Sequence, residues 1–492
     1  MPADDQDLAQ TTLSVVVCDG RRWFLKEPTS RLMQSTIRKV KYRERGKMRV
    51  ERAAGVRKPV PIAGDGKYEP TGCLGHRTGA VAKRKANWGE TPWKITFRGR
   101  WAALPDHVDF AVVGGGFTGL SAAAWLAKLA PKKTVLLLEA ERVGNGASGR
   151  TGGMALAQTA AGDLPGLGDV LRGYREILRI LRVDAELELP GVWEVARHEK
   201  SMEGKKVHPL KNSPIDWEDS GRVRAVSTFP GGTVNPGKVV SGLARAAKSA
   251  GAQVVEGAGV VRMEFSDPVR LHVERKLARG VERRTVTANK VLLATNAASR
   301  ELAGKIYSRK ELSEPRLTFA VATAPLTKKQ ITALGMDSGR PFYSVDFPYL
   351  WGRMLKNRGM IFGSGLVPAF GKSLREDSGR AKSVEAGVEK LWGGLERFNV
   401  RHGEPAARLR SLEKRVRLLH PAMKNARITY RWGGPILTTK DFMPTFRAHP
   451  ESKNVVVLGG FSGHGVALSV YLGKWSAQSL NGERSLPTWN RR

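Results

Sequence analysis

The spacing of apolar residues between positions 108 and 139 predicts a strand, a helix and a second strand. Residues 108–113 form a short apolar run that ends in glycines, as a buried strand does. Residues 121–130 are rich in alanine and leucine and are followed by Pro131, so we expect a helix that ends there. Residues 134–138 form a second apolar run that ends at Glu139. The pattern therefore predicts a βαβ unit.

Three glycines after the first predicted strand have the G-x-G-x-x-G spacing of dinucleotide-binding units. Gly114 would permit the tight turn, Gly116 the close approach of a pyrophosphate, and Gly119 the packing of the helix on the sheet. The helix N-terminus would offer free N–H groups to the phosphates, and Glu139 would accept hydrogen bonds from a ribose. A membrane helix over residues 110–130 is the alternative. The glycines near its start and the strand after it argue against that alternative.

Further runs continue the alternation of strands and helices. Leu171, Tyr174, Leu178 and Leu181 recur at three and four residues and predict an amphipathic helix over 164–189. Residues 191–197 alternate as a strand does. The later predicted elements are a helix that starts at Pro236 and ends before Gly251, a strand at 253–260, a buried strand and turn at 291–297, strand-like stretches at 316–326, 341–352 and 359–365, a helix at 372–398, and a strand, glycine loop and helix over 454–480.

Residues 1–90 carry the weakest pattern. The stretch 14–25 is compatible with a strand, whereas residues 38–58 are a basic run with few apolar positions and no clear period. Turn-forming residues dominate 58–79. This composition favours disorder. The segment is then either a basic arm that touches nucleic acid or an acidic partner, or an unstructured tail, for example an extension created by an upstream start codon.

Composition bears on partners and compartment rather than on fold. The 492 residues include 82 lysines and arginines against 46 acidic residues, a formal net charge of +36. Such a charge favours anionic substrates or nonspecific contact with nucleic acid, or it reflects a general bias toward Arg and Lys. Cys18 and Cys73 are too few for a disulfide framework or a metal-ligand cluster. The acidic start, with no apolar run after it, does not suit a targeting peptide, so we expect a cytoplasmic protein of two or three domains.

Several motifs resemble the D-amino-acid oxidase-like flavoproteins. These motifs are GGGFTGLSAA, the acid Glu139 and the loop GNGASGRTGG over 144–153. Later stretches agree, namely TVNPGKVVSGLARAAKSAGAQVVEGAGV, VLLATNA and VVVLGGFSGHGVALS, and the resemblance covers about residues 92–485. The family includes sarcosine, glycine and γ-glutamylputrescine oxidases and D-amino-acid dehydrogenases. The resemblance implies an α/β fold in which a Rossmann-type FAD-binding domain is interrupted by a substrate domain with a mixed sheet.

The resemblance also implies a discontinuous domain organisation. The expected parts are an N-terminal extension (1–90), a FAD-binding domain (91–190, 233–305 and 425–485) and a substrate domain (191–232 and 306–424). Residues 87–105 would pack on the outside of the FAD-binding domain, and residues 430–434 would return to it.

By the same resemblance, one set of residues is expected to hold FAD. These residues are Gly114, Gly116, Phe117, Thr118, Gly119, Glu139, Ala140, Ser148, Gly149, Arg150, Val260, Ala294, Thr295, Asn296, Gly460, Gly463, His464 and Gly465. The helix after Gly465 would direct its N-terminus at the flavin and stabilise negative charge on the reduced ring. His464 would either add positive charge at the flavin edge or cap its turn through a backbone hydrogen bond. Arg150 would contact phosphate or ring, or lie on the surface. Some members of the family attach flavin through a cysteine in the C-terminal stretch or a histidine in the first loop. Here the stretch 430–446 has no cysteine and the first loop, at 144–153, has no histidine, so we expect noncovalent attachment.

The resemblance implies oxidation of a C–N bond in an amino acid or small amine, giving an imine that hydrolyses. Arg353 is the candidate partner of a substrate carboxylate, because a guanidinium offers two parallel donors. Tyr343, Tyr349 and Trp351 would wall a pocket above the flavin, or serve only in the core. The electron acceptor would be oxygen, a quinone or another carrier. The alternative is a basic nucleic-acid-binding flavoprotein that acts on a modified tRNA base, motivated by the net charge and the run at 38–58.

Overall fold

The computed structural model describes residues 13–18, 21–26, 86–99, 102–197, 207–277, 279–298, 302, 316–346, 348–368 and 398–489. Residues 1–83 form one unit and residues 84–492 another. In the first unit, strands β1 (Leu13–Cys18) and β2 (Arg21–Lys26) pair in antiparallel register. This hairpin confirms the strand expected at 14–25. The basic run at 38–58 and nearly all of the helix expected at 372–398 lie outside the described residues.

The predicted βαβ unit lies within an eight-stranded sheet. It consists of β4 (His107–Val113), α1 (Phe117–Leu129) and β5 (Val135–Glu139), and β4 and β5 are parallel. Helix α1 begins four residues earlier than the apolar pattern indicated, because the glycine turn leads directly into it. The sheet has the order β11-β5-β4-β14-β13-β12, and β14 (Val281–Leu293) also pairs with β21 (Ser452–Gly459), which pairs with β20 (Thr445–His449).

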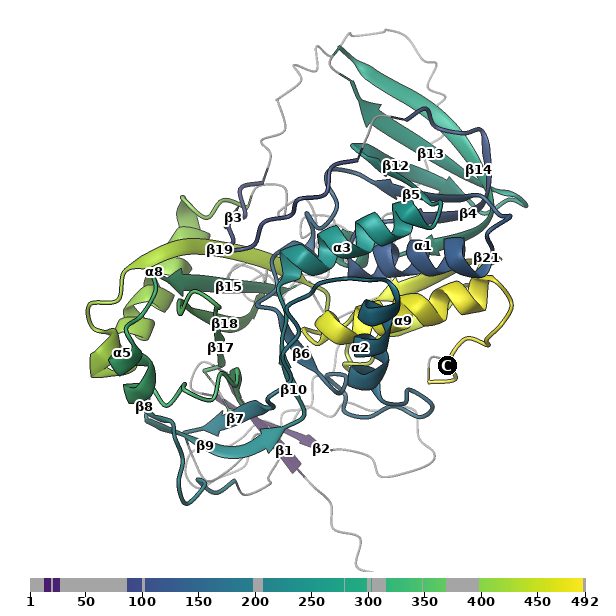
Figure 1. The fold of residues 1–492 in the computed structure, drawn as a ribbon. Helices are drawn as coiled ribbons and strands as arrows, with labels where there is room; N and C mark the ends of the chain where they lie inside the picture. Colours follow the sequence, from purple (N-terminus) through teal and green to yellow (C-terminus); the bar gives the residue numbers. More distant parts are fainter. Residues whose placement is uncertain are drawn as a thin grey trace, which may run out of the picture. The chain divides into compact units, whose positions relative to one another are not determined.

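Helices cover one face of this sheet (Figure 1). Helices α1, α3 (Pro236–Ser249) and α9 (Gly465–Leu480) pack together, and α2 (Val170–Ile180) lies against α9. Phe110 and Val112 of β4 belong to this core, whereas Ala111 and Val113 belong to the core on the opposite face. Helix α2 is shorter than the predicted 164–189, because the Asp169 side chain caps its start and the backbone of Arg182 turns left-handed (φ 51°) just after its end.

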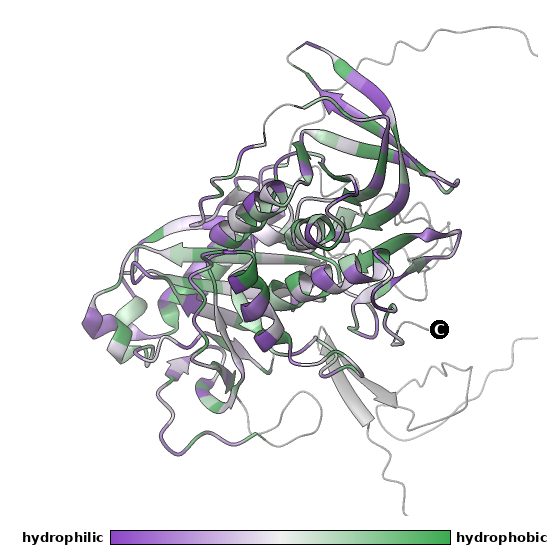
Figure 2. Cartoon of the chain, turned by 45° about the vertical axis from the view of Figure 1, so that its right-hand side comes forward, coloured by the Kyte–Doolittle hydropathy of each residue, from purple (hydrophilic) through white to green (hydrophobic). Residues whose placement is uncertain are grey.

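An antiparallel ribbon extends the eight-stranded sheet. It is formed by β12 (Ala258–Glu264), β13 (Val269–Lys276) and the first part of β14, and β11 (Gln253–Glu256) lies at the other edge of the sheet. Hydrophobic and hydrophilic residues alternate along the ribbon (Figure 2), and the buried positions of β13 face the second core of the sheet. Among the described helices, none is both long enough and apolar enough to span a bilayer.

A nine-stranded sheet forms the second layered part of residues 84–492. Its order is β3 (Gly89–Glu90), β19 (Ile428–Ile436), β15 (Arg316–Thr323), β18 (Met360–Pro368), β17 (Leu350–Met354), β16 (Phe342–Ser344), β7 (Val192–Ala196), β9 (Arg222–Phe229) and β8 (Asp216–Glu218). Helices α5 (Lys328–Ala333) and α8 (Gly403–Leu418) pack with the core on one face. A small pair of strands, β6 (Met154–Leu156) and β10 (Gly231–Thr233), is separate from both large sheets.

Two stretches belong to the nine-stranded sheet against expectation. Residues 430–434 were expected to return to the dinucleotide-binding sheet, but they lie in β19, which pairs with β15 and β3. The start of the 87–105 stretch also lies here, and the Trp88 ring stacks on Phe398 with 4.3 Å between ring centroids. The expectation for residues 430–434 was wrong, because an alternating pattern identifies a strand but tertiary packing decides the edge with which the strand pairs. The expectation for 87–105 fails only at the start of the stretch, since Phe97 and Leu104 pack in the two cores of the eight-stranded sheet.

Candidate functional site

The loops that carry most of the candidate residues meet at one edge of the eight-stranded sheet. Strands β5, β4, β14 and β21 are parallel where they adjoin, so their carboxyl ends lie together. The loops that follow them contain residues 114–116, 140–153, 294–298 and 460–464. Ligands of open α/β sheets bind at this edge. The structure therefore brings together segments that are far apart in the sequence.

The glycine turn after β4 leaves no room for side chains at two positions. Gly114 has a φ of +109°, and a Cβ added there would lie 2.8 Å from the carbonyl oxygen of Ala294. A Cβ at Gly119 would lie 1.9 Å from the carbonyl oxygen of Gly114. The first glycine therefore permits the turn, as predicted, and the third permits helix α1 to fold back onto that turn.

The first turn of α1, which includes Phe117 and Thr118, carries no acidic side chain. The N-cap residue of the helix is Gly116, with no side-chain cap. The Ser148 hydroxyl accepts a hydrogen bond from the Phe117 amide at 2.9 Å and lies 3.0 Å from where a Cβ of Gly116 would be. A helix end with this character suits a phosphate group, so the residues present fit a dinucleotide cofactor.

The Glu139 carboxylate is fixed beside the glycine turn. Its Oε2 accepts a hydrogen bond from the Gly115 amide at 2.7 Å, and its Oε1 accepts one from the Glu141 amide at 2.9 Å. Burial raises the pKa of this carboxyl above its usual range, although the two amides act against that shift. The next residue, Ala140, is exposed to solvent. It lies close to Gly259, the neighbour of Val260, because a Cβ added at Gly259 would be 3.4 Å from the Cβ of Ala140. The three residues expected at the ribose and adenine are therefore neighbours.

Arg150 binds its own loop. Its Nη1 donates to the carbonyl oxygen of Gly146 at 2.9 Å, and its Nη2 donates to Oδ1 of Asn145 at 3.0 Å. Burial lowers the pKa of the guanidinium to about 10. The short 3₁₀ turn Ala147–Gly149 precedes it, and Gly149 packs so closely that a Cβ would lie 2.3 Å from the carbonyl oxygen of Gly144. Arg150 thus stabilises the shape of the loop, a role that neither sequence reading anticipated.

Three tryptophans from outside the loop hold its next residues. The Trp432 Nε1 donates to the carbonyl oxygen of Arg150 at 2.9 Å, and the Trp93 Nε1 donates to that of Thr151 at 3.1 Å. Gly152 packs against the ring of Trp351, which a Cβ would approach to 2.1 Å. The sequence singled out Trp351 only. The other two could not be recognised, because nothing in their local pattern shows which carbonyl they reach.

The turns after β14 and β21 are joined by a side chain. Ala294 donates its amide hydrogen to Val113 at 2.9 Å, which continues the β4–β14 pairing. Asn296 has a φ of +46°, and its Oδ1 accepts a hydrogen bond from the Gly460 amide at 2.9 Å. Thr295 lies between them. Gly463 has a φ of +90° and open space around it, and Gly465 begins helix α9. The candidate residues of these two loops are therefore adjacent.

His464 is the N-cap residue of α9. Its amide donates to the carbonyl oxygen of Phe461 at 2.9 Å, and its ring Nδ1 lies 3.4 Å from the carbonyl oxygen of Ser462. Burial lowers the pKa of the imidazole below its usual value. The ring is therefore neutral at pH 7, which does not favour the reading in which it adds positive charge. The first turn of α9 contains no acidic residue, so its dipole remains available to an anionic group.

The face of the nine-stranded sheet that carries Trp351 and Trp432 is rich in aromatic rings, and we call it the aromatic face. Tyr343, Tyr349 and Tyr430 are half-buried against its core. The Tyr343 hydroxyl donates to Oε1 of Glu194 at 2.5 Å, and burial together with this partner raises its pKa. Burial also raises the pKa of Tyr349, to about 12. The three predicted aromatic residues therefore lie together on one face, and the sequence missed Glu194 and Tyr430.

Arg353 lies on the same face, and backbone carbonyl oxygens accept hydrogen bonds from its Nη1 and Nε. Its Nη1 donates to the carbonyl oxygens of Val234 at 2.5 Å and Gly153 at 3.2 Å, and its Nε donates to that of Met354 at 3.2 Å. The residue is 5% exposed, and burial lowers the pKa of the guanidinium to about 10. Its geometry does not favour the predicted pairing with a substrate carboxylate. Instead, Arg353 ties β17 to the backbone at the ends of two other segments.

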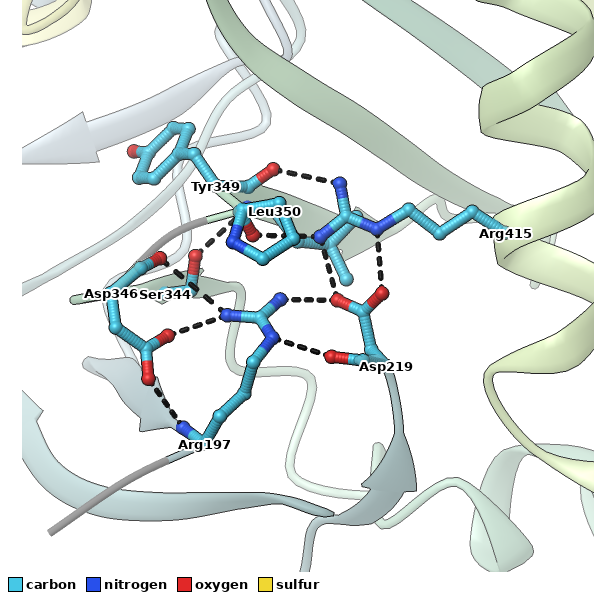
Figure 3. A network of polar contacts seen from close by, with 8 residues as sticks. Arg197, Asp219, Ser344, Asp346, Tyr349, Leu350 and Arg415 are labelled. Carbon is cyan, nitrogen blue, oxygen red and sulfur yellow. Dashed lines mark hydrogen bonds and ion pairs between the residues drawn. The ribbon is translucent and has the colours of Figure 1, made fainter. Parts of the chain in front are cut away.

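A buried ionic network lies at one end of the nine-stranded sheet (Figure 3). The guanidinium groups of Arg197 and Arg415 both bind the Asp219 carboxylate, and Arg197 also binds Asp346. Arg415 further donates to the carbonyl oxygens of Pro348 at 2.8 Å and Tyr349 at 3.0 Å. Burial alone would raise the pKa of Asp219, but the hydrogen bonds and charges of Arg415 and Arg197 hold it below its usual range. The network therefore fixes the turn that presents Tyr349.

Comparison with known proteins gives consistent matches over most of the chain. The model of the family described as FAD dependent oxidoreductase matches residues 109–479. The chain is 28% identical over 419 residues to the gamma-glutamylputrescine oxidoreductase of Escherichia coli, which covers 76% of this chain and 84% of that protein. It is 27% identical over 416 residues to the probable oxidoreductase OrdL of Haemophilus influenzae, with 77% and 84% covered.

Solved structures share the fold at lower identity. Glycine oxidase from Geobacillus kaustophilus superposes with a TM-score of 0.52 at 19% identity, over 77% of this chain and 96% of that chain. L-Amino acid deaminase from Proteus myxofaciens gives a TM-score of 0.57 at 15% identity, over 81% and 96%. These likenesses show that the chain shares the overall fold of these proteins.

Proposed function

Because the chain belongs to the family of FAD-dependent oxidoreductases, we propose that it binds FAD noncovalently and oxidises a C–N bond of an amino acid or small amine. The observation that carries the proposal is the meeting of four loops at the carboxyl edge of the eight-stranded sheet, with the aromatic face held against one of them. The curated relative in Escherichia coli is a gamma-glutamylputrescine oxidoreductase, which supports an amine or amino-acid donor.

The residues at the loop edge would divide the binding of FAD among them. The α1 N-terminus beside Gly116 would hold the pyrophosphate, and Glu139 would hold the ribose. The α9 N-terminus would face the flavin ring. The loop 144–153 has no histidine and the stretch 430–446 has no cysteine, which supports noncovalent attachment. When bound, FAD supplies an acceptor for two electrons.

The reaction is a two-electron oxidation that needs no strong acid–base pair from the protein. A neutral amine loses hydride from the carbon beside nitrogen, and the C–N bond becomes C=N with a positive charge on nitrogen. Water then adds to that carbon, and hydrolysis releases a carbonyl compound together with ammonia from a primary amine or a smaller amine from a secondary one. The electrons leave to oxygen, a quinone or another carrier. The contribution of this chain is orientation of the donor and exclusion of water by the aromatic rings.

Anaerobic reduction of the purified protein tests this proposal. The protein should be yellow, should release free flavin on acid precipitation, and should lose its visible absorbance when mixed with an amine or amino-acid substrate. A panel of amines, amino acids and hydroxy acids separates the classes. Colourless protein that does not take up added FAD, or bleaching by hydroxy acids alone, would refute it.

A further inference from the structure

One row of residues runs across the aromatic face and leads away from the loop 144–153. Cross-strand pairing places Trp351 beside Tyr343, Tyr343 beside Glu194, and Glu194 beside Ser227. Trp351 is the residue that contacts Gly152 of the loop. With about 4.8 Å between neighbouring strands, Glu194 lies roughly 10 Å along the row from Trp351. The row is therefore long enough to lie along a small molecule in an extended conformation.

Glu194 is a partly accessible carboxylate on this row. Trp193 and Val195, its neighbours in β7, are buried in the core of the opposite face, so alternation directs Glu194 to the aromatic face. Its Oε1 accepts a hydrogen bond from Tyr343, and its Oε2 accepts one from Ser227. A carboxylate has about four acceptor positions, so two remain for a further donor. The side chain is half-buried, whereas the other four residues of β7 are buried.

The positively charged residue of the aromatic face, Arg353, is less accessible than Glu194. Arg353 is almost fully buried, and three backbone carbonyl oxygens accept hydrogen bonds from it. A substrate carboxylate that took two parallel donors there would compete with these bonds, because each such pair of donors includes Nη1 or Nε. The aromatic rings of Tyr343 and Tyr349 favour a cation, because their faces carry partial negative charge. The available polar recognition on this face is therefore anionic and aromatic.

From this arrangement we propose that Glu194 is a specificity-determining residue that binds a second, cationic nitrogen of the substrate. The preferred donor is then a diamine or a similar amine with two nitrogens and no α-carboxylate. The nitrogen near the loop loses its proton and is oxidised as described above, while the distant ammonium keeps its charge and pairs with Glu194. This inference rests on the proposed function, because it assumes that the flavin lies against the loop 144–153.

Glu194→Gln is the matched variant, because glutamine can still accept from Tyr343 and can donate to Ser227. Loss of a charge-assisted hydrogen bond should raise KM for a diamine by about 10- to 100-fold with kcat little changed. KM for a monoamine of equal chain length should stay the same. The control is Glu413→Gln, which removes a carboxylate that pairs with Arg431. Glu413 lies on α8, which packs on the opposite face of the sheet, so both constants should be unchanged.

A binding measurement separates this inference from catalysis. A bis-guanidinium compound stays protonated at pH 7 and is not oxidised, yet it keeps N–H donors, so it should raise the melting temperature of the wild type and not that of Glu194→Gln. If no amine bleaches the flavin, the proposed function fails. If amines bleach it but α-amino acids are preferred, or Glu194→Gln leaves the diamine KM and the thermal shift unchanged, the assignment of Glu194 is overturned.

Discussion

Replacement of Asp219 by asparagine tests the energetic role of the ionic network. The carboxylate is 2% exposed and lies between Arg197, which is 1% exposed, and Arg415, which is 19% exposed. Asparagine keeps the size of the side chain but removes the charge, and its amide hydrogens would meet the donors of the two guanidinium groups. Breaking a buried pair by changing one partner costs about 3–5 kcal/mol. Because Arg197 keeps Asp346, we expect the lower end, about 3 kcal/mol.

The assay is urea unfolding of the whole chain at pH 7, followed by circular dichroism and tryptophan fluorescence together. Coincident transitions are needed before a free energy of unfolding is assigned. Glu404→Gln is the control, because the pair of Glu404 with Arg408 is exposed and should contribute only about 0.3–0.5 kcal/mol. A loss for Asp219→Asn below about 1 kcal/mol, or equal to that of the control, would contradict the reasoning.

The same variant should change the response to acid. The pKa of Asp219 in the folded protein is lowered, so its contribution is present above the ordinary aspartate pKa and is lost as the pH falls through the folded value. The difference in stability between wild type and Asp219→Asn should therefore be constant above about pH 4 and should shrink below it. A difference that stays constant down to strongly acidic pH would contradict the assigned ion pairs.

Three further variants test other parts of the site. Gly119→Ala should abolish flavin binding, because its Cβ would lie 1.9 Å from the carbonyl oxygen of Gly114, whereas Gly146→Ala, with open space around it, should retain full flavin content. Trp432→Phe should cost about 1–3 kcal/mol in urea unfolding and speed flavin release, because it leaves a loop carbonyl without its donor. The lowered pKa of His464 means that stability is lost as the pH falls below about 6.5, so in His464→Gln the melting temperature should fall less between pH 7.5 and 5.

The sequence was sufficient for the cofactor half of the molecule because that half is encoded locally. The turn at Gly114, the helix after it and the acid at Glu139 lie within one short segment, and each has a distinct sequence signal. The family resemblance then identified the loops at Asn296 and Gly460, which the structure joins by a hydrogen bond. The positions of these turns and loops depend on backbone geometry, and the spacing of glycines in a sequence indicates that geometry.

The substrate half was less predictable because its residues act through distant partners. Arg353 has the chemistry of a carboxylate-binding residue. Only the structure shows that its Nη1 donates to the carbonyl oxygens of Val234 and Gly153. Glu194 gave no signal, since one acid in a short alternating strand is ordinary. The place of β19 was also missed, because strand periodicity does not specify which edge a strand joins.

The position of β14 in the eight-stranded sheet has a consequence for how the protein is made. Val291 of β14 pairs with Ala111 of β4 on one side and with Val455 of β21 on the other. These two partners are roughly 340 residues apart, so at about 5–20 residues per second the ribosome needs roughly 17–70 s to make the second after the first. During that time β4 and then β14 emerge with apolar edges that lack their neighbours. The pairing around β14 therefore cannot be completed until β21 has been made.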